Sequence, residues 1–443
     1  MKNNFVIHIT IFVWALVSPF SAQADRIISD SIASTSGIIT EKQAVAEALA
    51  NNPSIAGMQS KAEAMRHIPS QASALPDPLL SLNALNLPTG SFSTAQENMT
   101  QLQIGLAQTI PFPGKLSLRE QTAHYEADSA GHDSNETRLT IVRNVRSRWW
   151  NLFYLDRALS IVQRNQVLLR QFVKIAETKY KTGQGLQSDV LLAQVELSKL
   201  LDIEIGLKAS HQHQSAQLNA LMNRQAQSPI KLPDQIDEKL PAIPDIESLR
   251  TQAMDFRPLL ASQRSKTNAA DSRIALAKKD YYPDFTLAGT YGSRHGINPA
   301  TGRSRTDLAS IKLSITLPLY AGSKQAEAVE QRKAEAASEQ FRLTDQIRAV
   351  DAEISSALAD YHARHDQAAL FKTGIIPQAS QTVSSMLASY QVNKVDFLNL
   401  VRAQITLYNY ETQYWKVISS GWQAWARLEA ATGKNLVRET DHE

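Results

Sequence analysis

This 443-residue chain has ten histidines and no cysteine, so histidine is the residue type most able to bind a transition-metal ion. Without a thiol there is no disulfide framework, no cysteine-ligated metal cluster and no thiol nucleophile. His211 and His213 form one pair, and His362 and His365 form another at the i, i+3 spacing of a helix face. Neither pair has further ligands nearby in sequence, so we interpret both as solvated helix faces. We predict no metal site and no cofactor.

Local catalytic motifs are also absent from the sequence. The chain contains no glycine-rich phosphate loop, no Gly-x-Ser-x-Gly nucleophile elbow and no His-Glu-x-x-His zinc motif. His362 and Asp366, four residues apart, are typical of a helix-surface contact rather than an acid–base dyad. With 46 basic and 43 acidic residues, the net charge of +3 gives no reason to expect a nucleic acid partner. We therefore predict a protein that is not an enzyme and has no catalytic residues.

The first 24 residues have the order of an export signal. Lys2 precedes an apolar stretch over 5–17, and Ala22-Gln23-Ala24 supplies a small-x-small cleavage site. The alternative, a buried N-terminal helix, fits less well because the apolar run stops at that site. We predict a signal peptide over 1–24. No later apolar run reaches the length of about 20 residues that a membrane-spanning helix needs.

The rest of the chain contains one structural plan twice. Matching residues recur in the same order about 205 to 210 positions apart, namely Pro53 and Pro258, Pro78 and Pro283, Tyr180 and Tyr390, and Ala193-Gln194 and Ala403-Gln404. Such a run of matches in one order is not expected by chance. We predict a first repeat over 25–228, a proline-rich linker over 229–246, a second repeat over 247–434 and a C-terminal tail over 435–443.

Both repeats show the same succession of hydrophobic periods. Each opens with a helical segment, continues with two alternating strands and a long helix, and ends with a turn and a shorter returning helix. In the first repeat these segments cover about 42–74, 79–87, 101–111, 115–182 and 187–224. In the second they cover about 247–279, 283–293, 307–318, 324–375 (resuming to 391) and 395–432. Gly374 and Pro377 predict a kink in the second long helix.

The segment lengths restrict how these elements can be arranged. At 1.5 Å per residue, the first long helix makes a rod of roughly 100 Å. The returning helix and the opening helix of the second repeat together match that length, so the chain can go out along one rod and return along two shorter ones. The strands are as long as membrane-spanning β-strands, but four cannot close a barrel. The two hairpins therefore either lie in a soluble sheet or combine with those of other chains.

This plan resembles the TolC-like outer membrane efflux family over nearly the whole mature chain. The resemblance rests on the duplication, on the turn over 180–194 with its partner over 390–404, and on the strand exits over 110–115 and 317–322. It implies a mostly α-helical fold with a membrane β-barrel contribution, in which a homotrimer closes a twelve-stranded barrel in the outer membrane lipid and a helical tunnel projects into the periplasm. It further implies the exit duct of a tripartite pump of the resistance-nodulation-division type. The implied partners are a periplasmic adaptor protein and an inner-membrane transporter.

The resemblance also gives the two helix–turn–helix tips a role. Gly183 and Gly185 let the first turn reverse, and Ser188 or Asp189 can cap the returning helix. These residues either make only a tight turn or also contact the adaptor. The second tip lacks the glycines, so its turn departs from this pattern. The residues implied to contact the adaptor are Gly183, Gly185, Leu186, Ser188, Asp189, Val190, Leu191, Val395, Asp396, Phe397 and Leu398. Asp189 and Asp396, which are not equivalent positions of the repeat, could also form a gate at a closed pore end.

The cargo is the least constrained part of this interpretation. The strand exit over 110–115, followed by Arg119, is similar to the branch that works with heavy-metal exporters of the cobalt–zinc–cadmium and copper–silver type. We therefore expect passive export of heavy-metal cations, with drugs or other small molecules as the alternative cargo. An alternative from a different class is a periplasmic coiled-coil adaptor or scaffold. An adaptor, however, would ordinarily show one helical hairpin, and this chain shows two.

Overall fold

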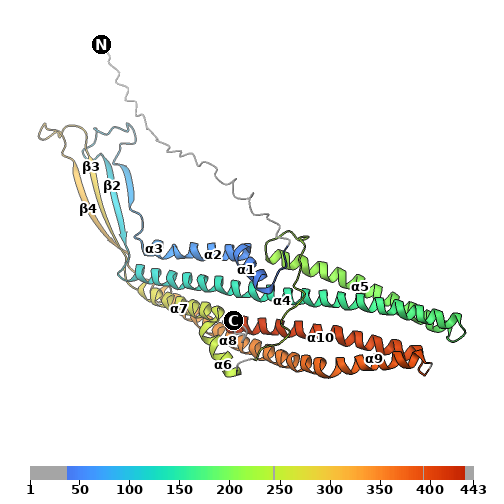
Figure 1. The fold of residues 1–443 in the computed structure, drawn as a ribbon. Coiled ribbons are helices and arrows are strands. Elements are labelled where there is room, and N and C mark those ends of the chain that lie inside the picture. The colour runs from blue at the N-terminus through green and yellow to red at the C-terminus, as the bar shows by residue number, and fades with distance from the viewer. Residues whose placement is uncertain (1–36, 243–244, 393, 435–443) are drawn as a thin grey trace, which may run out of the picture.

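The computed structural model of the chain describes residues 37–242, 245–392 and 394–434. Its long helices share one direction, with a four-stranded sheet at one end and two helix–turn–helix tips at the other (Figure 1). The predicted signal peptide over 1–24 and tail over 435–443 lie outside the described residues. Among the described helices, none is long and apolar enough to cross a membrane.

Two series of elements follow one another in the same order. The first series is α1 (Glu41–Asn51), α2 (Pro53–Arg66), α3 (Ile68–Ser73), β1 (Leu79–Leu85), β2 (Gln101–Ile110), α4 (Lys115–Lys181) and α5 (Gln187–Leu221). The second is α6 (Ile246–Phe256), α7 (Pro258–Lys279), β3 (Phe285–Ser293), β4 (Leu308–Ile315), α8 (Gln325–Leu370), the π-helical turn η1 (Phe371–Ile375), α9 (Ile376–Gln391) and α10 (Phe397–Thr432). This order confirms the predicted succession of helix, β-hairpin and long helical hairpin.

The opening segments are broken where the sequence analysis predicted continuous helices. Proline at the first position of α2 and of α7 has no N–H to donate, and it holds the preceding residues, Asn52 and Arg257, in extended conformation with ψ of 120° and 114°. Asn52 also accepts a hydrogen bond from Ser54 N at 2.9 Å and so caps α2. At the predicted interruption the structure has the π-helical turn η1, which contains Gly374, and Pro377 lies in the first turn of α9, into which the helix continues.

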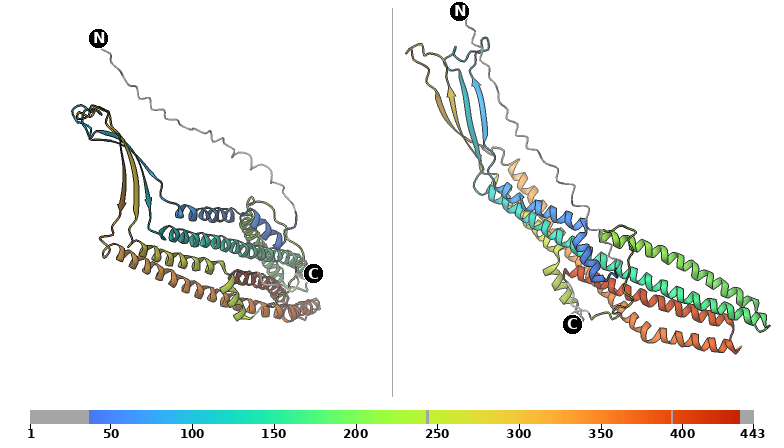
Figure 2. Two further views of the ribbon diagram at one scale, coloured as in Figure 1. Left: turned by 90° about the vertical axis from the view of Figure 1, so that its left-hand side faces the viewer. Right: turned by 45° about the horizontal axis from the view of Figure 1, so that its top comes forward.

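Helix α4 is the central rod against which the rest of the fold packs. Its N-terminal half lies along α7, where Ser129 Oγ and Ser262 Oγ are 2.9 Å apart. Its C-terminal half lies along α5, where Gln166 Nε2 donates to Glu204 Oε2 at 2.7 Å. The predicted path, out along one rod and back along two shorter ones, is therefore confirmed (Figure 2).

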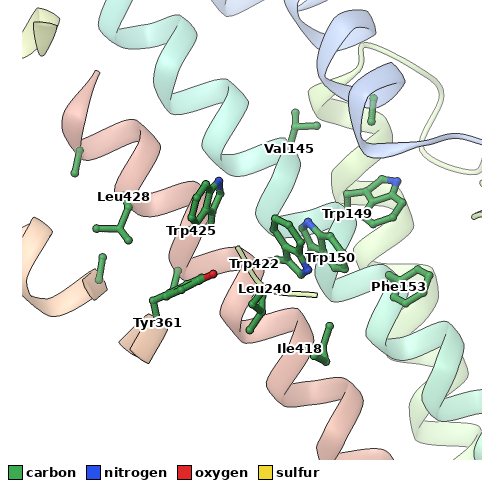
Figure 3. Close-up of a cluster of buried hydrophobic side chains, with 14 of the residues drawn as sticks. Val145, Trp149, Trp150, Phe153, Leu240, Tyr361, Ile418, Trp422, Trp425 and Leu428 are labelled. Atoms are coloured by element: carbon green, nitrogen blue, oxygen red, sulfur yellow. The ribbon is translucent and has the colours of Figure 1, made fainter. Parts of the chain in front are cut away.

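The main hydrophobic core lies midway along the rods, where α4, α8 and α10 meet. Trp150 of α4 and Trp422 of α10 stack with their ring centroids 5.0 Å apart and their planes within 7° (Figure 3). The linker enters this core through Leu240, which is 5% exposed. A Cβ atom on Gly421 of α10 would lie 2.7 Å from Leu240 Cδ1, so the missing side chain lets linker and helix approach closely.

Candidate functional site

The four-stranded sheet is antiparallel, with strand order β1-β2-β3-β4, and its two faces differ in chemistry. Successive side chains of a strand point to opposite faces, so the register decides which residues lie together. One face aligns Leu82 with Ile104 and Tyr291, and the next row of the same face aligns Leu80 with Leu106. These are exposed large side chains: Leu82 is 75% exposed and, in that second row, Ile311 is 86% exposed. A wide apolar surface is therefore uncovered in the described part of the chain.

The opposite face carries small and polar side chains through most of its length. One row aligns Ser81, Gly105, Thr290 and Ser310 across all four strands. A Cβ atom on Gly105 would lie 2.8 Å from both Ser81 Oγ and Thr290 Cγ2, so glycine is required for this close packing. The outer edges of β1 and β4 pair with no other described strand.

The base of the sheet is joined to the helices by a buried lysine that forms ion pairs with two partly exposed aspartates. Lys115, at the start of α4, is 4% exposed, and its Nζ lies 3.0 Å from Asp284 Oδ1 and 3.2 Å from Asp280 Oδ1. Asp284 Oδ1 also accepts a hydrogen bond from Phe112 N at 2.8 Å. The Phe112 ring stacks on Tyr282 at 4.5 Å. The strand exit over 110–115 is thus the joint at which the two hairpins are locked together, a role that sequence reasoning missed because its partners lie about 170 residues away.

The two helical tips contact one another through Lys179, which the sequence analysis did not single out. Lys179 Nζ, near the end of α4, donates to the backbone carbonyl oxygen of Tyr390 at 2.8 Å. The same nitrogen lies 4.3 Å from the centre of the Tyr390 ring, within the range of a cation–π contact. One side chain of the first hairpin therefore holds the end of α9 in the second.

Beneath this contact lies a second, smaller hydrophobic core. The Tyr390 and Phe397 rings are 5.2 Å apart, and Phe172 of α4 meets Phe397 edge-on at 6.4 Å. Phe397 is only 1% exposed, so the structure places this candidate adaptor residue inside the tip rather than on its surface. Its aromatic packing makes the two tips one unit.

The first turn reverses as its glycines predict, but its helix cap differs from the prediction. Gly183 has a left-handed φ of 73°, and a Cβ on Gly185 would lie 2.9 Å from Lys179 Cβ. Neither Ser188 nor Asp189 occupies the cap position, because α5 begins at Gln187 with Leu186 at the cap and no side-chain hydrogen bond from Leu186. Both polar residues lie in the first turn of the helix instead, where the Asp189 carboxylate is hydrogen-bonded to the backbone of Leu186.

The remaining candidate residues divide by exposure. Leu186 is 67% exposed, Leu191 54% and Leu398 40%, so each tip presents apolar side chains to its surroundings. Gly183, Ser188 and Asp396 are exposed, whereas Gly185, Asp189, Val190 and Val395 are half-buried.

The negative charge of Asp396 in the second tip acts on Asp189 in the first. Burial raises the pKa of Asp189 above its ordinary value. Hydrogen bonding to the Leu186 backbone opposes that rise, the negative charge of Asp396 adds to it, and Lys179 opposes it. Burial, followed by the charge of Asp189, raises the pKa of Tyr390 as well. One acidic residue from each repeat thus contributes to the electrostatics of the tips.

The paired histidines lie apart from the tips, in the later part of α5 and the later part of α8. Burial lowers the pKa of His211, and His213 Nε2 lies 2.8 Å from Gln217 Nε2 one turn away. Asp366 contacts its neighbour His365, with His365 Nδ1 3.3 Å from Asp366 Oδ1. Within the residues that the structure describes, no three His, Asp or Glu side chains gather as metal ligands would.

A family model described as outer membrane efflux protein matches residues 44–224 and 249–434. Nodulation protein T of Rhizobium leguminosarum bv. trifolii is 21% identical over 367 residues, which cover 81% of this chain and 77% of that protein. Cobalt-zinc-cadmium resistance protein CzcC of Cupriavidus metallidurans is 21% identical over 366 residues, 82% of each chain. The crystal structure of CusC has the same fold, with a TM-score of 0.76 at 16% identity over 89% of this chain and 92% of CusC.

Proposed function

Because this chain belongs to the outer membrane efflux protein family, we propose that it is the exit duct of a tripartite pump of the resistance-nodulation-division type. Three copies close a twelve-stranded barrel in the outer membrane, and their helices form a tunnel that projects into the periplasm. The observation that carries this proposal is the sheet with one exposed apolar face and two unpaired edges.

The sheet chemistry supports a membrane-inserted trimer over a soluble sheet. An open sheet edge in lipid leaves backbone N–H and C=O groups without partners, which costs several kcal/mol for each group. A barrel removes that cost if β4 of one copy pairs with β1 of the next. Four strands from each of three copies make twelve, above the minimum of about eight for a bacterial barrel.

Cell fractionation tests this arrangement. The full chain should be recovered from the outer membrane and should migrate as a trimer after extraction in mild detergent. Recovery from the periplasm as a monomer that needs no detergent would contradict the proposal and favour the adaptor or scaffold alternative.

The exposed apolar side chains of the tips support docking to a periplasmic adaptor. The proposed contact surface consists of the accessible candidates of the two turns, Gly183, Leu186, Ser188, Leu191, Asp396 and Leu398, with the half-buried Gly185, Asp189, Val190 and Val395 at its border. Phe397 is left out because it packs inside the tip. Exposed leucines rimmed by polar groups are typical of protein contact sites.

Crosslinking in cells tests the docking surface. Leu186→Asp should abolish crosslinks between tip and adaptor while the trimer persists. Gln187→Asp is the matched control, since Gln187 is exposed beside it and already polar. Equal crosslinking in both variants would contradict an apolar contact at this tip.

Asp189 and Asp396 supply the proposed gate at the tunnel end. Their mutual repulsion favours separation of the two turns, whereas Lys179 and the aromatic core favour contact. The balance between these terms would bias the tip toward open or closed, and its pH dependence is a prediction in the Discussion.

Heavy-metal cations are the proposed cargo, and transport through the duct is passive. The similarity to a cobalt-zinc-cadmium resistance protein and the strand exit over 110–115 support this choice. Drugs or other small molecules are the alternative cargo. A deletion strain should lose tolerance to at least one of zinc, cobalt, cadmium, copper and silver. Unchanged tolerance to all five would contradict the metal cargo.

A further inference from the structure

Lys312 is the only charged residue in the four strands. It lies in β4, and the register aligns it with Ala288, Ala107 and Leu79, which offer no counter-charge. Its side chain is exposed, and within the described residues it has no hydrogen-bond or ion-pair partner. A lone, unpaired charge in the middle of an otherwise neutral sheet is a feature that the fold does not explain.

The alternation of β4 decides which way Lys312 faces. Ile311 and Leu313, on either side of it, belong to the exposed apolar face, so Lys312 belongs to the opposite face with Ser310 and Ser314. If the apolar face meets lipid, Lys312 faces the water-filled interior. The reverse orientation would place a lysine in lipid near the middle of the strand, where a positive charge is most costly.

We propose that Lys312 places a ring of three positive charges in the barrel interior, and that this ring favours anions over cations at its own level of the duct. This inference rests on the proposed function, because the ring exists only if three copies close one barrel. At ~10 mM salt, where the screening length is ~30 Å, the ring should concentrate a monovalent anion roughly threefold and deplete a monovalent cation by the same factor. At ~0.15 M salt the screening length is ~8 Å and the effect should fall below about twofold.

The ring bears directly on the cargo. A free divalent cation would be depleted by the square of the monovalent factor, because it carries twice the charge. The heavy-metal cations proposed above would therefore cross this level of the barrel against the potential. An anionic small molecule, or a metal held in an anionic complex, would be attracted by the same positive potential.

A different role for Lys312 follows from its place on an edge strand. Lysines on edge strands discourage pairing with the wrong chain. That role predicts that neutralising Lys312 increases aggregation and leaves the environment of the interior unchanged, so the two roles differ in what they predict for charged probes.

Thiol labelling in the full-length trimer separates these roles, because the chain has no cysteine of its own. Ser310→Cys lies two residues from Lys312 on the same face. The trimer in lipid nanodiscs is labelled with two methanethiosulfonate reagents, an anionic sulfonatoethyl and a cationic trimethylammonioethyl derivative. Each labelling rate is divided by the rate of the same reagent with a free small thiol. The two normalised rates report the local electrostatic potential at the cysteine. At ~10 mM salt, adding Lys312→Gln should lower the anionic-to-cationic rate ratio about tenfold, and the change should shrink at ~0.5 M salt. Lys312→Arg should leave the ratio as it was.

The controls keep this inference distinct from the proposed function. Ile311→Cys, on the apolar face, should be protected from both reagents by lipid. If Ile311→Cys reacts as fast as Ser310→Cys, the membrane-facing assignment and the proposed barrel are both wrong. A second outcome would overturn only the role of Lys312. In that outcome Ile311→Cys is protected and Ser310→Cys reacts, as the barrel requires, but Lys312→Gln leaves the rate ratio unchanged.

Discussion

Lys179 reaches from the first helical hairpin to the second and donates a hydrogen bond to the backbone oxygen of Tyr390, 211 residues away in the sequence. The same ammonium group covers the face of the Tyr390 ring at 4.3 Å. Two different attractions thus converge on one residue at the end of α9, the helix that precedes the second turn. The position of one tip relative to the other depends on this contact and on the aromatic core below it.

Replacing Lys179 with Met should loosen the second tip. The substitution keeps the apolar stem but removes the hydrogen bond and the cation–π contact, which together contribute about 1 to 2 kcal/mol. Amide hydrogen exchange over 386–392 should accelerate, while exchange in α4 near Trp150 should not change. Lys181→Met is the matched control, since Lys181 is exposed in the same tip. Equal acceleration in both variants would show that Lys179 does not join the hairpins.

The stability of the tip should depend on the protonation of Asp189. Its pKa in the folded tip lies above the unfolded value, so the folded state binds this proton more tightly. Stability should therefore fall as the pH rises from about 4, the unfolded value, through the raised pKa, and level off above it. Hydrogen exchange in the tip, corrected for its intrinsic pH dependence, measures this trend.

Asp189→Asn should remove that pH dependence and protect the tip more strongly than the wild type at pH ~7. Asp396→Asn should weaken the trend without abolishing it, because burial is the larger cause of the raised pKa and repulsion by Asp396 is a smaller one. The same pH profile for wild type and Asp189→Asn would refute a role for this carboxyl group in the gate.

Two glycines with the same backbone conformation should tolerate alanine very differently. Gly183 and Gly433 have φ of 73° and 74°, but a Cβ on Gly183 meets nothing within 4 Å, whereas one on Gly433 would lie 2.5 Å from Phe256 O. Gly183→Ala should cost about 1 kcal/mol from the left-handed conformation alone. Gly433→Ala should cost about 2 to 4 kcal/mol because overlap is added. Thermal unfolding measures both, and equal costs would contradict the close approach at Gly433.

Arg257 should be one of the most sensitive charged residues in the chain. Its side chain is 6% exposed, and its Nη2 and Nε donate to Glu136 at 2.8 and 3.1 Å. Arg257→Met strands the Glu136 carboxylate and should cost about 3 to 5 kcal/mol of unfolding free energy. Adding Glu136→Gln should recover part of that loss.

The matched control for Arg257 is Arg250, which pairs with Asp351 at 2.6 Å but is 38% exposed. Arg250→Met should cost no more than about 1 kcal/mol, because water screens an exposed pair. A comparable loss of thermal stability in the two single variants would mean that burial does not set the strength of the Arg257 pair.

Much of the fold could be predicted because its elements follow local patterns. Leu102, Ile104 and Leu106 alternate with smaller or polar residues, and such a period of two identifies a strand with two unlike faces. Likewise, the turn at Gly183 follows from glycine's freedom at positive φ. The breaks before Pro53 and Pro258 were predictable in principle from the missing N–H, although the segments were predicted as continuous helices.

The candidate sites were harder to predict. Ser188 and Asp189 carry the side chains of helix caps, yet α5 begins at Gln187, earlier than either cap would start it, and both residues fall inside its first turn. Phe397 reads as a tip residue from its position in the chain, but its burial depends on Phe172 and Tyr390, which come from two other helices. Sequence position alone does not distinguish a docking residue from a core residue.

The sequence by itself determined the repeated order of elements, the family and the two faces of each strand, because these depend on hydrogen bonds and periodicities that span a few residues. Only the tertiary structure decided that Lys179 meets Tyr390, that Lys115 lies between Asp280 and Asp284, and that Asp396 of the second repeat is near enough to Asp189 of the first to raise its pKa. Such contacts join residues on helices whose side-by-side placement depends on the packing of the whole chain, so no local pattern encodes them.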